Sequence, residues 1–250
     1  MKRIIHSALV TLLLASAVCA VGIANAATLD LTTVGASGIL NGALFQQVDT
    51  QSTGSGVIDS FVRIQANGIE EGYNTDYRHV EFDEHTTATF NHSLNLSSVP
   101  IVKVYGVDYR EFLLDVNEST SQRELSLDKL ELYLLGSGNL HNYASFGTPI
   151  YTLDPDPEPE KDNWIKLDYS LNSGSGSGDM FAYIPNSFFT GPNQYVYLYS
   201  RFGDNISTNA GFEEWALVER EQPPIPEPSG VLALLIGLVG VGGQFRRRTS

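Results

Sequence analysis

Three histidines with carboxylates between them form a candidate metal site. If residues 79–85 formed a strand, alternate side chains would share one face, and two imidazoles and two carboxylates could converge there. Nitrogen and oxygen ligands of this kind suit zinc or a similar ion. The alternative is a polar, solvated strand or loop, because the spacing matches no compact metal motif such as H-E-x-x-H. The residues concerned are His79, Glu81, Asp83, Glu84, His85 and His92.

An acidic segment and two neighbouring glutamates raise the question of calcium, which prefers oxygen ligands. In the segment, carboxylates alternate with prolines or Lys161, and the prolines should hold the carboxylates apart along an extended chain. Calcium bound within the fold, through Glu213 or Glu214, is a second alternative. We therefore predict no cofactor and leave calcium as the open alternative. The acidic segment comprises Asp154, Asp156, Glu158, Glu160 and Asp162.

The sequence contains none of the common catalytic motifs. It has no G-x-S-x-G elbow, no P-loop and no glycine-rich dinucleotide turn after a predicted strand. Residues 27–226 carry 28 acidic and 10 basic side chains, so pairs of carboxylates arise by chance and do not identify a glycosidase. We predict that the protein is not an enzyme. The net charge of −18 on these residues repels phosphate backbones, so we also predict no nucleic-acid partner.

Three alternating tyrosines, Tyr195, Tyr197 and Tyr199, are the candidate binding surface. In a strand they would share one face, and Val196 and Leu198 would share the other. An exposed row of aromatic rings is the surface with which carbohydrate-binding modules cover the apolar faces of sugars. The alternative is that a neighbouring strand or loop covers the tyrosines. The two interpretations differ in whether the three rings are exposed in line.

The elements that must position these residues are short strands. Runs of β-branched, aromatic or alternating apolar residues are separated by Gly, Asn, Ser, Asp and Pro. No stretch has the apolar spacing of a large helix, although residues 185–189 could form one helical turn. We predict an all-β fold over residues 27–221, a two-sheet sandwich of antiparallel strands with a jelly-roll-like arrangement. The predicted strands are 57–65, 100–107, 110–116, 125–135, 164–169, 179–184, 195–202 and 212–218.

The N-terminal residues have the three parts of an export signal. A short positive region and an apolar run precede an A-x-A site formed by Ala24 and Ala26. We predict a signal peptide at residues 1–26, which signal peptidase cleaves after Ala26. Cleavage would remove Cys19, the single cysteine, so the domain would depend on its apolar core rather than on disulfides.

The C-terminal residues form a second three-part pattern, in which Pro-Glu-Pro precedes an apolar run and an arginine cluster. The apolar run, residues 230–245, would reach about 24 Å as a helix, which is short of the ~30 Å hydrocarbon core of a membrane. The arginines would stay cytoplasmic by the positive-inside rule. A second Pro-Glu-Pro, at residues 157–159, is followed by charged residues and lacks the run. The residues of the predicted sorting signal are Pro226, Glu227, Pro228, Arg246, Arg247 and Arg248.

This C-terminal pattern resembles the PEP-CTERM sorting domain of Gram-negative bacteria and covers residues 222–250 as a proline stalk, a short transmembrane helix and an arginine cluster. The resemblance implies transient anchoring in the inner membrane and recognition by an exosortase, an integral membrane cysteine peptidase that removes the tail. It also implies delivery to the cell surface or extracellular matrix, where such proteins are associated with exopolysaccharide and biofilm production. Four blocks of the body resemble a group of uncharacterised PEP-CTERM proteins, a resemblance that implies no activity: residues 54–65, 71–76, 109–115 and 211–215.

Together these patterns predict an exported protein of the cell surface or extracellular matrix, with a structural or adhesive role in an exopolysaccharide or biofilm. The alternative function is a glycan-binding module whose partner is an exopolysaccharide. A polysaccharide-active enzyme ranks third.

Overall fold

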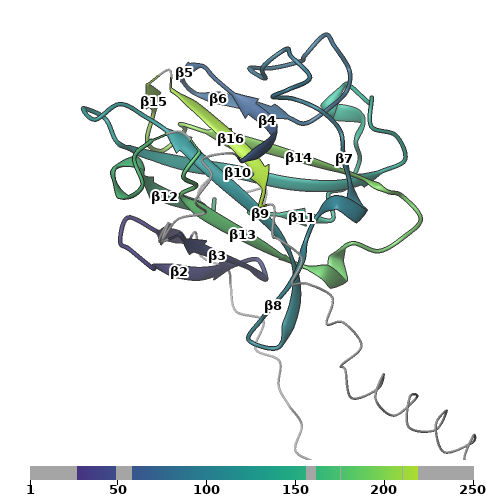
Figure 1. Ribbon diagram of the computed structural model, residues 1–250, viewed down its shortest axis with the longest axis horizontal. Helices are drawn as coiled ribbons and strands as arrows, with labels where there is room; N and C mark the ends of the chain where they lie inside the picture. Colours follow the sequence, from purple (N-terminus) through teal and green to yellow (C-terminus); the bar gives the residue numbers. More distant parts are fainter. Residues whose placement is uncertain (1–26, 49–57, 156–161, 175, 210, 219–250) are drawn as a thin grey trace, which may run out of the picture.

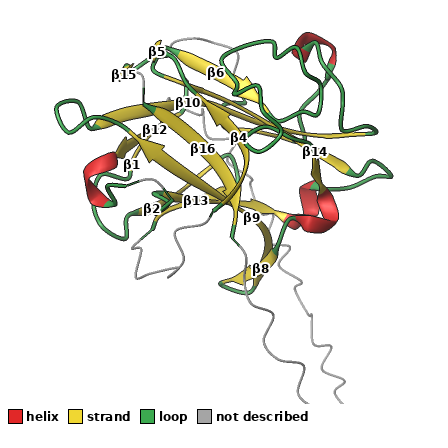
Figure 2. Ribbon diagram, turned by 45° about the horizontal axis from the view of Figure 1, so that its top comes forward, coloured by secondary structure: helices red, strands yellow, loops and turns green. Residues whose placement is uncertain are grey.

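Two packed β-sheets form the body of the protein in the computed structural model, which describes residues 27–48, 58–155, 162–174, 176–209 and 211–218. Figure 1 shows the two layers of strands, and Figure 2 shows that the described helices are short. The prediction of an all-β sandwich is confirmed. The described helices are single 3-10 turns: η1 (Leu96–Ser98), η2 (Tyr143–Ser145), η4 (Tyr169–Leu171) and η5 (Asn186–Phe188), the last lying where one helical turn was expected.

Each large sheet has seven strands, and a two-stranded ribbon lies beside them. The first sheet has the order β1 (Thr28–Asp30), β12 (Trp164–Asp168), β10 (Glu124–Leu135), β14 (Tyr195–Phe202) and β6 (Glu70–Tyr73), with β11 (Tyr151–Thr152) beside β10 and β7 (Leu94–Asn95) beside β14. The second has the order β2 (Ser37–Leu40), β3 (Ala43–Gln47), β13 (Met180–Pro185), β9 (Val107–Asn117), β16 (Phe212–Leu217) and β4 (Asp59–Ile64), with β8 (Ile101–Val104) beside β9. The ribbon pairs β5 (Asn67–Gly68) with β15 (Thr208–Asn209).

The predicted strands correspond to β4, β8, β9, β10, β12, β13, β14 and β16, and the strands that sequence patterning missed are short. The predicted strands pair antiparallel with one another, whereas β1, a strand that was not predicted, pairs with β12 in parallel, Thr28 lying opposite Trp164. An antiparallel pair joined by a tight turn has its direction set by that turn. No such turn joins β1 to β12, because the two strands lie far apart in the sequence. The local sequence therefore does not determine whether they pair in parallel or antiparallel.

The apolar core lies between the two sheets. Alternate residues of β9 and β14 point into it, as the sequence predicts, and so do the leucines of β10 other than Leu135, which packs against a second cluster outside the sandwich. A β-bulge between Leu127 and Lys129 shifts the register of β10, so that Leu127 and Leu130 both face the core although they are three residues apart. Trp215 of β16 is fully buried and donates a hydrogen bond across the core to Ser200 Oγ at 3.0 Å, whereas Trp164 is half-buried and does not belong to the core.

The two ends of the sandwich differ. At one end the β8–β9 hairpin projects beyond the sheets, turning through Tyr105 and Gly106, which both have positive φ. At the other end the chain closes tightly over the core with the β5–β15 ribbon (Figure 1). Here a Cβ on Gly211 would lie 1.5 Å from the carbonyl oxygen of Asn117, so only glycine permits this approach of the two backbones.

Candidate functional site

The tyrosines of β14 are covered rather than exposed. Tyr197 has no exposed surface, Tyr199 is 3% exposed, and Tyr195 is half-buried against the same cluster. Tyr143 stacks on Tyr199 with ring centroids 4.2 Å apart, and Phe146 meets Tyr197 edge to face at 4.9 Å. The interpretation with three rings exposed in line is therefore contradicted, and the alternative, in which a neighbouring segment covers the tyrosines, is confirmed. The covering segment 136–148 leaves no aromatic platform on which a sugar could stack.

These rings belong to a tyrosine cluster on the outer face of the first sheet, which we define as Tyr73, Tyr133, Tyr143, Phe146, Tyr197 and Tyr199. The hydroxyl of Tyr197 donates to the carbonyl of Ser137 at 2.8 Å and accepts from the amide of Leu140 at 2.8 Å. These two bonds tie the covering segment to β14. The cluster is thus a second apolar core, built outside the sandwich.

Three glutamates accept the phenol hydrogen bonds of the tyrosine cluster. Glu71 accepts from Tyr199, Glu81 accepts from Tyr73 at 2.8 Å, and Glu131 accepts from both Tyr133 and Tyr143. Burial raises the pKa of these four tyrosines, and the hydrogen bonds to carboxylates raise it further. The phenols therefore remain protonated donors, and the carboxylates around the cluster are structural acceptors.

One feature of the sequence, apart from the alternation on β14, indicated that the tyrosines would be covered. The two long segments without strand patterning, residues 74–93 and 136–150, contain Phe82, Tyr143 and Phe146, whose rings must be buried somewhere. Nothing local to these segments indicates which face receives them.

The histidines do not converge on a metal site. Residues 79–83 form bends rather than a strand, His79 and Glu81 are exposed, and His85 packs against Phe90 with ring centroids 5.1 Å apart. The carboxylates are hydrogen-bond acceptors for backbone amides instead: Glu84 accepts from Tyr73 and Phe82, and Asp83 from Glu71. His92 contacts the carbonyl of Ala88. As the described side chains stand, no three His, Cys, Asp or Glu residues form a metal site.

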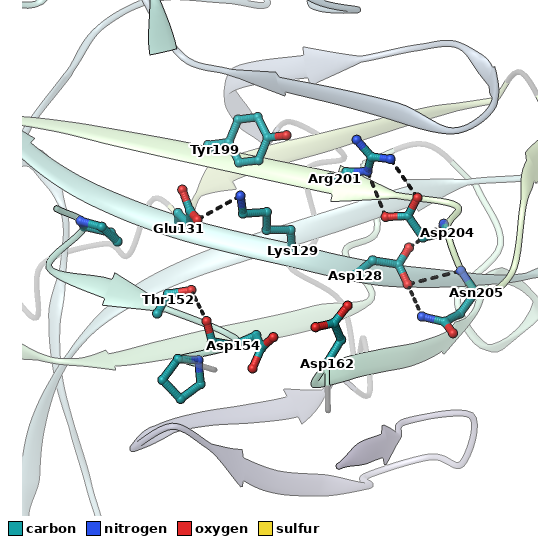
Figure 3. Close-up of a pocket in the computed structure, with 12 residues that line it drawn as sticks. Asp128, Lys129, Glu131, Thr152, Asp154, Asp162, Tyr199, Arg201, Asp204 and Asn205 are labelled. Atoms are coloured by element: carbon teal, nitrogen blue, oxygen red, sulfur yellow. Dashed lines mark hydrogen bonds and ion pairs between the residues drawn. The ribbon is translucent and has the colours of Figure 1, made fainter. Parts of the chain in front are cut away.

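An open cleft lies beside the tyrosine cluster on the outer face of the first sheet, with a volume of about 520 Å³ (Figure 3). It contains two members of the predicted acidic segment, Asp154 and Asp162, while Asp156, Glu158 and Glu160 lie outside the described residues. Its size is that of a small-ligand site. The lining residues are Asp128, Lys129, Glu131, Pro149, Thr152, Asp154, Pro155, Asp162, Tyr199, Arg201, Asp204 and Asn205.

Several charges of the cleft hold its own wall in place. The Arg201 guanidinium donates two hydrogen bonds of 2.8 Å to the Asp204 carboxylate. Asp128 accepts from the amide of Asp204 at 2.7 Å and from the side chain of Asn205 at 2.7 Å. These bonds lower the pKa of Asp128, but burial outweighs them and raises it. The turn at residues 203–205 is therefore fixed. The wall presents positively charged hydrogen-bond donors and negatively charged acceptors to the cleft.

The two glutamates considered for calcium lie on opposite faces of β16. Glu214 points outward and forms an ion pair with Arg63, whose guanidinium also lies over the ring of Phe90, so Glu214 already has a cationic partner. Glu213 points into the sandwich, is fully buried, and has no hydrogen-bond partner at either carboxylate oxygen. Of the two, only Glu213 has oxygens free for a ligand.

The predicted terminal signals lie outside the described residues. These are Ala24 and Ala26 of the signal cleavage site, and Pro226, Glu227, Pro228, Arg246, Arg247 and Arg248 of the sorting signal. Within the part of the chain that the structure describes, no helix has the length and apolar character needed to cross a membrane.

Comparisons with known proteins found no relative: no family model, no curated protein and no solved structure matches the chain.

Proposed function

We propose that this protein is exported, anchored for a time in the inner membrane, and sorted by an exosortase to the cell surface or extracellular matrix, where it has a structural or adhesive role in an exopolysaccharide or biofilm. The observation that carries the proposal is the order of three parts at residues 226–248: Pro-Glu-Pro, a short apolar run and three arginines. The run is shorter than a permanent membrane anchor requires. The predicted N-terminal signal at residues 1–26 would carry the body across the inner membrane. The tail predicts the same orientation, because arginines that stay in the cytoplasm leave the body on the outer side.

The body is a two-sheet sandwich, for which we propose the structural or adhesive role. Successive strands cross repeatedly between the sheets, as from β9 to β10, from β12 to β13 and from β13 to β14, and we infer from this that the sandwich is of the jelly-roll type. The described residues include no cysteine, so the fold depends on its two apolar clusters for stability.

Replacing Glu227 with Ala tests the sorting proposal. The variant should accumulate at full length in the inner membrane, because the peptidase would no longer find its recognition triplet. Cell fractionation with an antibody against the body measures this. The matched control is Glu158→Ala in the internal Pro-Glu-Pro, which has no apolar run behind it and should be processed like the wild type. Normal processing and release of the Glu227→Ala variant would contradict the proposal.

A second candidate function is binding of a saccharide in the open cleft. It is favoured by the lining of this cleft of about 520 Å³ beside Tyr199, which combines positively charged hydrogen-bond donors with negatively charged acceptors. Asp162→Ala, at an exposed position of the cleft wall, should weaken retention on the exopolysaccharide of the producing cell without changing the fold. Asp108→Ala, on the distant β8–β9 hairpin, is the control. Equal retention of both variants and the wild type would exclude the cleft as the binding site.

A further inference from the structure

Three glutamates point into the sandwich at the end closed by the β5–β15 ribbon. Glu213 of β16 lies opposite Val116 on one neighbouring strand and Ile64 on the other, and both of these face the core. Glu118 is two residues beyond Val116, so it shares the inward face and lies diagonally across from Glu213.

Glu70 reaches the same end of the sandwich from the first sheet. Its carboxylate accepts a 2.8 Å hydrogen bond from the amide of Ala66, which is two residues beyond Ile64 in the chain. Because Ile64 lies opposite Glu213, this bond holds the Glu70 carboxylate at the same end of β4 as Glu213. Glu70 and Glu213 have no exposed surface, and Glu118 is 6% exposed. All three carboxylates are therefore removed from water at one place.

The oxygens of this group are mostly without partners. Both carboxylate oxygens of Glu213, Oε1 of Glu70 and Oε1 of Glu118 are buried and make no hydrogen bond. The hydroxyl of Thr208 is a fifth such atom, in a residue that is 2% exposed. The side chain of the next residue, Asn209, bonds to Ser119 and Gln122 at the surface, so strand alternation directs Thr208 inward. The backbone amide of Asn209 donates to the other oxygen of Glu118 at 3.2 Å, which places Thr208 beside the glutamates.

Such a group is electrostatically unfavourable without a cation. The ion pairs formed by the described basic side chains involve other carboxylates, and none reaches Glu70, Glu118 or Glu213. Burial raises the pKa of Glu70 to about 8, with the charge of Glu118 adding to the effect, and burial raises the pKa of Glu118 to about 7. Buried carboxylates without a cationic side chain either hold protons or coordinate a metal ion.

We propose that Glu70, Glu118, Glu213 and the hydroxyl of Thr208 close around one calcium ion and join the two sheets at this end. In this structure the three carboxylates do not yet surround a common point. The ion would draw them together, because mutual repulsion is replaced by attraction to the cation. Glu70 and Thr208 begin strands and Glu118 lies one residue past the end of β9, where side chains can reorient without breaking a sheet.

Calcium fits this group better than other common ions. Oxygen-only ligands exclude a preference for zinc or copper, which favour nitrogen and sulfur. Calcium accepts six to eight oxygens in irregular geometry, and three carboxylates and a hydroxyl can supply most of them. Magnesium demands octahedral geometry and keeps several waters, which a dry site at the edge of an apolar core does not favour. The proposal is independent of the sorting function.

Calcium binding is tested on the full-length chain, purified in a mild detergent and freed of metal with a chelator. Calcium at a hundred times its dissociation constant should raise the unfolding temperature by about 5 °C or more, and magnesium should have a smaller effect. Terbium, which replaces calcium, should luminesce on excitation of tryptophan, because Trp215 lies two residues from Glu213 on the same face of β16. An unchanged unfolding temperature together with absent terbium luminescence would overturn the proposal.

The variants Glu213→Gln and Glu214→Gln separate this site from general charge effects. Glu213→Gln should lose both the calcium shift and the terbium signal. Glu214→Gln changes the adjacent residue in the same way but on the opposite face. It should keep the calcium shift, measured from its own unfolding temperature without calcium, and it should keep the terbium signal while folded. If Glu213→Gln fails to fold, Thr208→Val replaces it, since valine keeps the shape, removes one oxygen ligand and should lower the calcium affinity. A calcium response that survives Glu213→Gln and Thr208→Val would contradict the site.

Discussion

Glu70 and Glu71 are neighbours on β6, yet their carboxylates lie in opposite environments. Glu71 points to the outer face of the first sheet, where it accepts hydrogen bonds from the phenol of Tyr199 and from Arg201. Glu70 points inward and accepts one hydrogen bond, from the amide of Ala66. β16 repeats the contrast, with Glu214 paired to Arg63 on the outside and Glu213 unpartnered on the inside.

The difference shows how the two regions treat buried charge. In the tyrosine cluster each carboxylate meets phenols or a cationic side chain of this chain, so the polar network is satisfied without a ligand. At the closed end of the sandwich the protein supplies acceptors but few donors. A satisfied network serves as structure, whereas an unsatisfied one requires protons or an ion. The tyrosine cluster is therefore satisfied without a ligand, and the closed end of the sandwich is where we propose one.

The largest expected effect concerns the outer region. Tyr197→Ala should destabilise the protein by about 3–5 kcal/mol, because it removes a fully buried ring and the two hydrogen bonds that hold the covering segment. Chemical denaturation of the variant and the wild type measures the difference. Tyr105→Ala, at a 96% exposed ring on the β8–β9 hairpin, should change stability by less than about 0.5 kcal/mol. A loss of stability in Tyr197→Ala as small as that in Tyr105→Ala would mean that the tyrosine cluster is not a core.

A smaller effect separates the two glutamates of β16. Without calcium, Glu214→Gln should cost about 2 kcal/mol, because Arg63 keeps its charge and loses the carboxylate. Glu213→Gln should cause no loss or a slight gain, since it removes a buried carboxylate that has no partner. Denaturation in the presence of a chelator measures both variants. Comparable losses in the two variants would show that the two faces of β16 do not differ as described.

The smallest effect is a pH dependence that originates at Glu70. The pKa of Glu70 in the folded protein is about 8, above its unfolded value, and the facing charges are Glu118 and Asp83. A raised folded pKa favours the folded state at low pH, and this stability is lost as the pH rises toward 8. Between pH 6 and pH 7, without calcium, one such group should lower stability by about 1 kcal/mol.

Glu70→Gln tests that assignment, because glutamine cannot titrate. The variant should lose about that much less stability over the same pH interval. A residual decline is expected, since burial also raises the pKa of Glu118. The same decline in the variant and the wild type would mean that Glu70 does not hold a proton at neutral pH.

Much of the fold could be predicted because strand alternation is local. Phe112, Leu114 and Val116 share the inward face of β9, as their spacing indicates, and Leu130, Leu132 and Leu134 do the same on β10. The short strands β1, β2 and β7 escaped prediction because two to four residues do not establish a period. The candidate calcium site was predicted in part. Glu213 or Glu214 was considered as a calcium ligand from the sequence, but nothing in the local sequence linked Glu213 to Glu70 or Glu118.

Which side chains of a strand share a face can be predicted from the local sequence, because the two-residue period of a strand depends only on its own backbone. The sequence also carries the predicted terminal signals, which are read as linear patterns. What lies opposite each face depends instead on how distant segments pack in the folded protein. Tyr197 is covered through bonds to residues 57 and 60 positions away in the chain, and Glu70 meets the charge of Glu118 from the other sheet. Burial and pairing depend on these distant segments, and no local period encodes which of them will meet.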